Sequence, residues 1–153
     1  GLTIDREAVP AFVKRFQEIA NSSLSKEDCL PVLSIDGEVS LYDLSLDLVM
    51  QMKRMEPYGL ANPEPTLACR GLQVMRYPRR LGEGGEHLKM KVRKGGKVME
   101  SIGFGMGHLG NELEESGRLI DLAFCPLINT YQGNPSLQLR MKDLRFSPSQ
   151  EFP

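Results

Sequence analysis

Five segments with alternating apolar and polar residues follow residue 66, and this pattern constrains the fold more than any other feature of the chain. In the clearest of them Leu88, Met90 and Val92 alternate with basic side chains. Period-two alternation is typical of a strand that is buried on one face. A change of phase across Gly71 indicates a bulge or a sharp bend in the first segment. The sequence therefore predicts five strands, near 67–74, 87–93, 98–104, 120–131 and 137–142.

A tight turn and one short helix set the order of these strands. Lys94-Gly95-Gly96-Lys97 predicts a hairpin between the second and third strands. Residues 109–115 predict a short helix between the third and fourth strands. The predicted order is three strands, a helix and two more strands, and the first strand is bent. This is the order of a five-stranded Greek-key barrel, the OB fold. We therefore expect a mainly β protein with flanking helices (α+β), in which a helical and extended segment precedes the barrel.

Two helices and a proline-rich connector are predicted ahead of the strands. Apolar residues from Val9 to Ala20 recur at helical spacing, so we expect a helix over about 7–20 whose apolar stripe is buried. Residues 32–35 predict a short extended piece, and Asp36-Gly37 predicts a turn. Ser40 and Asp43 resemble a capping box and predict that the second helix begins there.

Prolines 57, 63 and 65 cannot continue the second helix and favour an extended connector, where we place a domain boundary. The predicted organisation is a first part at 1–56, the connector at 57–65, the barrel at 66–146 and a tail at 147–153.

Charge is divided unevenly between the two halves of the chain. Residues 1–65 hold 6 basic and 11 acidic side chains, whereas residues 66–146 hold 13 basic and 8 acidic ones. Such asymmetry indicates that the second half meets a polyanion. A basic face that merely solvates the barrel is the alternative.

Basic and aromatic residues occupy the positions at which an OB fold binds oligonucleotides or oligosaccharides, namely the second and third strands and the loops after the first and fourth. Lysine and arginine can follow phosphates, and tyrosine can stack on bases, as single-strand binding requires. The predicted contacts are Arg76, Tyr77, Arg79, Arg80, Lys89, Lys91, Arg93, Tyr131, Gln138, Arg140 and Lys142.

A glycine motif, Gly105-Met106-Gly107-His108-Leu109-Gly110, matches the G-x-G-x-x-G of dinucleotide-binding proteins. The preceding strand is reached through a tight hairpin and the following helix is short, which disagrees with a βαβ unit. Asp121 also stands before the next strand's apolar core, whereas the ribose-binding acid ends its strand. The motif is better explained as a strand-to-helix corner.

Few residues are available for catalysis or metal binding. Histidines 87 and 108 have no partner at ligand spacing, and the three cysteines, Cys29, Cys69 and Cys125, are scattered. We therefore expect no catalytic residue, metal or cofactor on this chain, and reduced thiols in the cytoplasm. No apolar run approaches the length of a membrane span, so a membrane is not an expected partner.

The segment Glu56-Pro57-Tyr58-Gly59-Leu60-Ala61-Asn62-Pro63-Glu64-Pro65 resembles the E-P-[FY]-G-x-x-N-P-x-P segment of the RecJ family of single-stranded-DNA-specific exonucleases. The resemblance extends nearly over the whole chain, and the opening residues 1–4 are similar to part of the family's DHHA1 subdomain. Its further segments are 87–89, 102–107, 121–124 and 137–145.

The resemblance implies a C-terminal fragment made of the end of DHHA1, the connector and the OB domain. The full enzyme degrades single-stranded DNA from the 5′ end with a divalent metal, Mn or Mg, in recombination and repair. The DHH core that holds this metal is missing here. The OB domain then guides the strand, with Lys89, Arg140 and Lys142 as the best-supported contacts. Tyr131 stands where the family often has tryptophan, and it can still stack.

The implied partners are single-stranded DNA, the missing DHH/DHHA1 core, and single-strand-binding or other repair proteins. The alternative is a docking domain, in which the barrel contacts the nuclease core or a replication or repair partner and its basic face is incidental.

Overall fold

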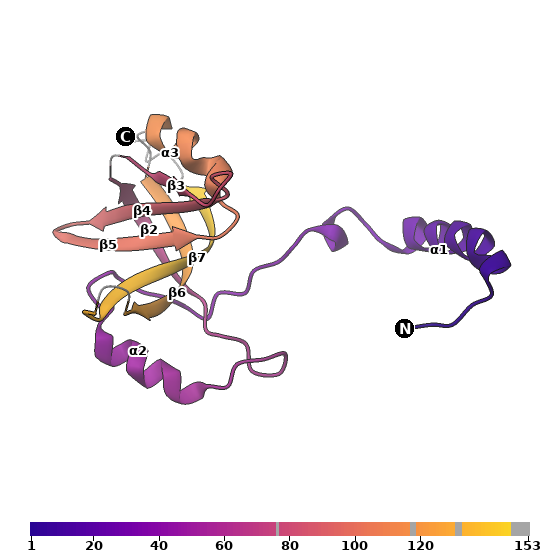
Figure 1. Ribbon diagram of the computed structural model, residues 1–153, viewed down its shortest axis with the longest axis horizontal. Coiled ribbons are helices and arrows are strands. Elements are labelled where there is room, and N and C mark those ends of the chain that lie inside the picture. Colours follow the sequence, from indigo (N-terminus) through magenta and orange to yellow (C-terminus); the bar gives the residue numbers. More distant parts are fainter. Residues whose placement is uncertain (76, 117–118, 131–132, 148–153) are drawn as a thin grey trace, which may run out of the picture. The chain divides into compact units, whose positions relative to one another are not determined.

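The computed structural model describes residues 1–75, 77–116, 119–130 and 133–147, which belong to two compact units divided between Leu33 and Ser34 (Figure 1). The first unit holds the short 3-10 helices η1 (Arg6–Ala8) and η2 (Glu27–Cys29) and the helix α1 (Val9–Ser23). Pro10 lies in the first turn of α1, where its missing N–H leaves no helical bond unmade. The predicted helix is confirmed, but its apolar stripe is exposed rather than buried within the described residues.

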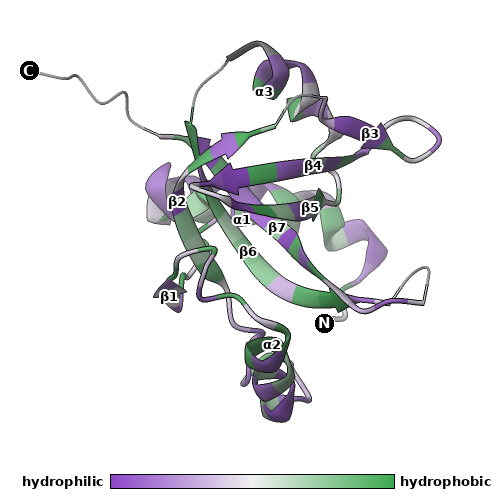
Figure 2. Cartoon of the chain, turned by 90° about the vertical axis from the view of Figure 1, so that its left-hand side faces the viewer, coloured by the Kyte–Doolittle hydropathy of each residue, from purple (hydrophilic) through white to green (hydrophobic). Residues whose placement is uncertain are grey.

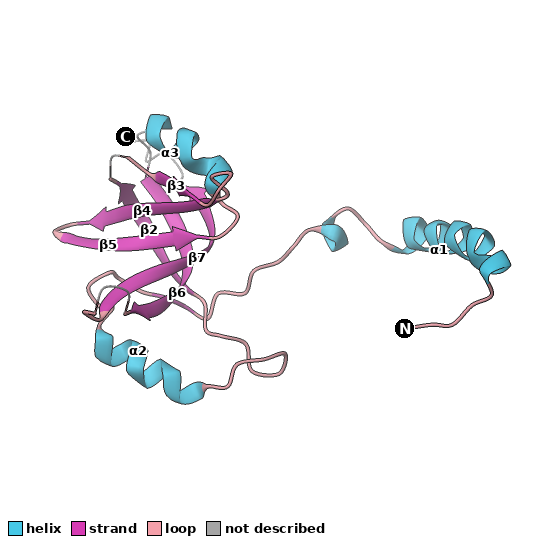
Figure 3. Cartoon of the chain, viewed as in Figure 1, coloured by secondary structure: helices cyan, strands magenta, loops and turns pink. Residues whose placement is uncertain are grey.

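The second unit is a seven-stranded sheet with two short α-helices (Figure 3). The helices are α2 (Leu46–Met52), continued by η3 (Lys53–Met55), and α3 (Gly110–Ser116), preceded by η4 (Gly107–Leu109). The strands are β1 (Gly37–Glu38), β2 (Leu67–Val74), β3 (Arg79–Leu81), β4 (His87–Lys94), β5 (Lys97–Gly103), β6 (Leu119–Asn129) and β7 (Ser136–Phe146). Figures 1 and 2 place α2 and α3 at opposite ends of this sheet.

The strand pairings form a ring. β2 pairs with β4, β4 with β5, β5 with β7, β7 with β6, and β6 returns to β2. The β5–β7 pair is parallel and the other four pairs are antiparallel. Together with the helix between β5 and β6, this is the predicted five-strand order of the OB fold. The fold class predicted from the sequence is confirmed.

The bend predicted in the first barrel strand is also confirmed. The register between β2 and β6 shifts between Cys69 and Leu72, and Gly71 between them has a φ of +63°. A left-handed backbone at this point is open to glycine at little cost, and a bulge lets one strand turn between two partners. β2 can therefore pair with β6 along most of its length and with β4 at its end.

The core lies between the inward faces of the barrel strands. In β4, buried Leu88, Met90 and Val92 alternate with polar residues, as the green and purple segments of Figure 2 show. The largest fully buried side chains of the barrel strands are Phe124, Leu72, Leu88, Ile120, Leu122 and Leu139. Leu41 and Leu44, which precede α2, are buried in the same cluster.

Two predictions for the segment before the barrel are wrong. Gly37 does not form a turn with Asp36, because it belongs to β1 and pairs in parallel with Leu67. The second helix does not begin at Ser40. Ser40 and Asp43 do form a local bond, from the Ser40 N–H to Asp43 Oδ2 at 2.8 Å, but it closes only a turn.

The helix α2 begins at Leu46, where the side chain of Ser45 accepts the N–H of Leu48 at 3.1 Å. The N-terminal cap is therefore a serine five positions later than the one predicted.

The connector packs on the barrel in this structure. The second compact unit begins at Ser34, so residues 34–65 group with the strands and not with the first 33 residues. This differs from the predicted boundary at 57–65, because Leu41 and Leu44 are part of the barrel core. We call residues 45–65, which comprise α2, η3 and the connector, the strap.

The glycine motif makes a tight corner between β5 and η4. The N–H of Gly107 donates to the carbonyl of Glu86 at 2.8 Å. A Cβ at position 107 would lie 1.8 Å from the carbonyl oxygen of Gly85, so only glycine allows this approach. The strand before the motif, β5, is antiparallel to β4. This agrees with the predicted corner and disagrees with a dinucleotide-binding unit, whose strands are parallel.

Candidate nucleic-acid interface

The outer surfaces of β3, β4, β5 and β7 gather most of the predicted contact residues. Because cross-strand partners point to the same side of a sheet, the register shows which side chains meet. Arg79 pairs with Lys89, Lys89 with Ile102, and Ile102 with Arg140. Three cations from three strands therefore lie in one row, which we call the cation row: Arg79, Lys89 and Arg140.

The neighbouring row holds Lys91, Glu100 and Gln138. We call the whole surface the basic face, and its charged or polar predicted contacts are Arg79, Lys89, Lys91, Arg93, Gln138, Arg140 and Lys142. Gln138 keeps only 7% of its surface exposed, so little of this side chain is open to a ligand.

The cations on β3 and β4 keep most of their charge available. Arg79 and Lys91 are exposed, and within the described ranges neither forms an ion pair. The guanidinium of Arg93 donates to the neutral Oε1 of Gln73 at 2.6 Å, and that of Arg80 to Oδ1 of Asn111 at 3.0 Å. Neutral acceptors orient a guanidinium without cancelling its charge, so these groups can still attract a phosphate.

The positive charge of Lys89 is partly neutralised by a neighbouring carboxylate. Its Nζ lies 3.2 Å from Oε2 of Glu100 on β5, and both side chains are a little over one-third exposed. An ion pair at this exposure contributes little free energy because water screens it. A phosphate can therefore compete with Glu100 for Lys89.

Arg140 and Lys142 are held by the strap. The guanidinium of Arg140 donates to Oε2 of Glu64, and Nζ of Lys142 lies 3.9 Å from the same oxygen. Nε of Arg140 is buried without a hydrogen-bond partner among the described residues. In this arrangement the two cations fasten the strap to β7, a role that the alternation in β7 did not reveal.

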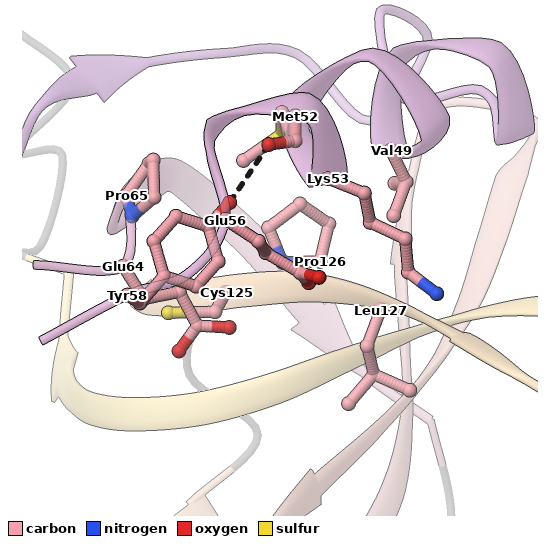
Figure 4. Close-up of a pocket in the computed structure, with 10 residues that line it drawn as sticks. All are labelled: Val49, Met52, Lys53, Glu56, Tyr58, Glu64, Pro65, Cys125, Pro126 and Leu127. Carbon is pink, nitrogen blue, oxygen red and sulfur yellow. Dashed lines mark hydrogen bonds between the residues drawn. The ribbon is translucent and has the colours of Figure 1, made fainter.

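The strap also packs on the outer side of β6 around a cavity of about 110 Å³ (Figure 4). The hydroxyl of Tyr58 donates to the carbonyl of Met52 at 2.8 Å and closes the strap on itself. Ligand pockets usually measure hundreds of cubic ångströms, so this cavity is too small for a nucleotide. Burial raises the pKa of the Cys125 thiol at its wall, and a protonated thiol is unreactive.

The loop contacts are described in part. Tyr77 is 72% exposed with a φ of +70°, and Arg80 is exposed in β3. Arg76 and Tyr131 lie outside the described residues. The stretch 79–81, expected as loop, is a strand paired with β4, which fixes the position of Arg79 beside Lys89.

Sequence reasoning missed an aromatic residue on this face. Phe104 follows β5 and is 59% exposed, and its ring meets the ring of His87 edge-on at 5.2 Å. Continuing the alternation of the hairpin one step past Ile102 would have placed Phe104 beside His87 on the basic side.

No group of three or more His, Cys, Asp or Glu side chains able to hold a metal occurs within the described ranges. Likewise, no helix in the described part of the chain has the length and apolar character needed to cross a membrane.

Known proteins share both the sequence pattern and the fold. A sequence model of the RecJ OB domain matches residues 35–143. The single-stranded-DNA-specific exonuclease RecJ of Bacillus subtilis (strain 168) is 29% identical over 152 residues, which is 99% of this chain and 19% of that protein. The RecJ of Escherichia coli (strain K12) is 27% identical over 143 residues, covering 91% of this chain and 24% of that protein.

A solved structure has the same fold. RecJ from Thermus thermophilus, crystallised in complex with Mn²⁺, superposes with a TM-score of 0.67 at 22% identity and covers 97% of this chain and 21% of its own. The chain thus spans about a fifth to a quarter of the length of the relatives it matches. The match over residues 35–143 begins next to Ser34, where the second compact unit starts, and the chain belongs to the RecJ OB domain family.

Proposed function

We propose that this chain is the single-stranded-DNA-binding module of a RecJ-like 5′-to-3′ exonuclease acting in recombination and repair. The module itself is not catalytic and guides the strand toward a DHH nuclease core outside this chain. That core binds Mn or Mg and cuts the strand. The other partners proposed are single-strand-binding or further repair proteins, in the cytoplasm.

The observation that carries this proposal is the cation row. Arg79 and Lys89 come from consecutive strands and Arg140 from a strand about 50 residues later, yet the register aligns all three across the sheet. A linear set of cations suits a linear set of phosphates, and an OB fold binds oligonucleotides on this surface. The names of the matched relatives, single-stranded-DNA-specific exonucleases, agree with this choice of ligand.

The second candidate is a docking domain that contacts the nuclease core or a repair protein. One observation favours it: Glu64 already neutralises part of the charge of Arg140 and Lys142, which leaves fewer cations for DNA. The two candidates differ in how binding should depend on salt.

The test is fluorescence anisotropy of a labelled single-stranded oligonucleotide titrated with the chain at several salt concentrations. The best variant is Arg79→Gln/Lys91→Gln. Neither side chain has an ion-pair partner among the described residues, so the change leaves no carboxylate without its partner. We expect weaker binding and a slope of log K against log[salt] that is less steep by about 1.4, since each phosphate contact on a single strand contributes about 0.7.

The matched control is Lys14→Gln/Lys26→Gln, which removes the same charge from the first compact unit. Its slope should equal that of the wild type. Loss of steepness in both variants would mean that only net charge matters, and absence of binding by the wild type would favour the docking domain. A duplex of the same sequence should bind more weakly than the single strand.

A further inference from the structure

We infer that Phe104 is a stacking surface for one unpaired base of the bound strand, next to the cation row. This inference rests on the proposed function, because it assumes that the basic face holds single-stranded DNA. It adds a contact with the bases to a face that otherwise offers contacts with phosphates.

The position of Phe104 on the basic face follows from the hairpin register. Leu88 pairs with Gly103 and Lys89 with Ile102, so Phe104 comes next to His87 on the same side as Ile102. Two residues along a strand span about 7 Å. A nucleotide whose phosphate contacts Lys89 is therefore close enough to lay its base on the ring of Phe104.

Phe104 keeps much of its surface open to solvent. The residue is 59% exposed, although the adjacent Gly103 is buried against Met106 and Met141. A single exposed apolar side chain is ordinary on a protein surface. This one, however, lies among cations, and aromatic rings interleaved with cations are what sequence-tolerant binding of single strands uses.

The ring is held in place before any ligand arrives. The N–H of Gly105 donates to Nδ1 of His87 at 3.2 Å, and Nδ1 of His108 donates to the carbonyl of Gly105 at 3.2 Å. Both histidines of the chain thus hold the backbone of Gly105, which follows Phe104, and His87 also contacts the ring edge-on. A ring fixed in advance loses little conformational freedom when a base stacks on it, which favours binding.

The experiment uses the full chain and its lack of tryptophan. In the Phe104→Trp variant the sole indole reports on stacking, and we expect its fluorescence to be quenched by an oligothymidylate. An oligonucleotide of equal length built from abasic spacers keeps the phosphates but has no bases, and it should bind without quenching. Met50→Trp is the control, because Met50 is an exposed apolar residue of α2 and does not belong to the basic face.

The binding constants provide a second readout. Phe104→Ala should weaken binding of the oligothymidylate by between about 5-fold and about 150-fold, the range found for base–aromatic stacking. Its affinity for the abasic strand and its salt slope should stay as in the wild type, and Phe104→Tyr should restore most of the loss.

Several outcomes overturn the inference, and they can be told apart. If the wild type binds both strands and Phe104→Ala weakens neither or both alike, Phe104 does not stack on a base while the proposed function stands. If the wild type binds neither strand, the proposed function itself fails and the inference fails with it. Quenching by both strands, or equal quenching of Met50→Trp, also contradicts stacking at this position.

Discussion

Asp121 shows how one side chain can hold the irregular part of the barrel together. Its Oδ1 accepts the N–H of Gly71 at 3.0 Å and the hydroxyl of Ser147 at 2.7 Å, and its Oδ2 accepts Nε of Arg145 at 3.0 Å. The carboxylate therefore joins the β2 bulge, the strand β6 and the end of β7. In the sequence this residue is only the first acid after a glycine motif and its short helix.

The acid titration of the barrel should depend on Asp121. Burial raises the pKa of this carboxyl, but the hydrogen bonds from Ser147, Gly71 and Arg145 outweigh burial and hold the pKa below its usual value. A group with a lowered folded-state pKa stabilises the fold above its unfolded pKa, about 3.9, and this contribution is lost as the pH falls through the folded pKa.

We therefore expect Asp121→Asn to lower the free energy of unfolding by about 1 to 3 kcal/mol at about pH 7. The difference from the wild type should shrink toward about pH 3. Urea unfolding at several pH values in this range measures the free energy of unfolding and its dependence on pH. Glu114 is an exposed acid on α3, and Glu114→Gln should leave that dependence unchanged. A difference of constant size at every pH would contradict a role for the ionised carboxylate.

The strap is the element that most affects how the basic face can work. It presents Glu64 to Arg140 and Lys142, so an acidic group of the chain occupies a place suited to a phosphate. All three side chains are partly exposed, and the contacts between them are screened by water. A strand and the strap therefore compete for the same two cations.

Removing the charge of Glu64 should strengthen DNA binding. In Glu64→Gln the cations at 140 and 142 are free to meet phosphates, and the salt slope should become steeper by up to about 1.4. The loss in stability should be about 1 kcal/mol, the upper end of what ion pairs screened by water contribute, because these pairs are only partly exposed. Salt-dependent anisotropy measures the slope, with Glu56→Gln in the same segment as control. An unchanged slope would mean that Arg140 and Lys142 serve only to fasten the strap.

The sequence predicts those elements whose signals are local. The alternation in β4, the bulge at Gly71 and the hairpin at Gly95 each depend on neighbouring residues, and all three are confirmed. The start of α2 was misplaced because Leu41 and Leu44 have helical spacing although they are buried in a turn region before the helix.

Contacts between distant segments were not predictable in the same way. β3 was missed because its two arginines have no apolar alternation, and its pairing with β4 depends on the loop that joins them. The basic side of β4 could be read from the sequence, whereas the contact between Glu64 and Arg140 depends on where the strap packs. The position of a loop relative to a strand is a tertiary property, which local periodicity does not contain.

At the scale of the whole molecule, the two compact units differ in how many apolar residues they bury. Every buried apolar residue of the described part lies between Leu41 and Met141, in the second unit. In the first unit the ring centroids of Phe12 and Phe16 lie 5.8 Å apart, on a helix that has no buried residue. The second unit therefore contains what it needs to fold.

Residues 34–153 should fold without the first 33 residues. We expect this truncated chain to have the same midpoint temperature of unfolding and the same affinity for DNA as the full chain, because its core and its basic face are complete. A second truncation, 66–153, should be severely destabilised, because it loses Leu41 and Leu44, and removing a fully buried leucine usually costs about 2 kcal/mol or more. Circular dichroism melting compares the two. Equal stability of both would support the domain boundary predicted at 57–65.

The ring of strand pairings also fixes the order in which the molecule can be completed. The β4–β5 hairpin joins strands that are neighbours in the sequence and can form within microseconds. The pairing of Leu67 with Phe124 and that of Glu100 with Gln138 join residues that are far apart in the sequence. Pairings between such distant residues make β barrels fold in milliseconds to seconds. On the ribosome, β5 therefore keeps one edge open until β7 has emerged. The cation row is therefore complete only when β7 has paired with β5, because this pairing aligns Arg140 with Ile102.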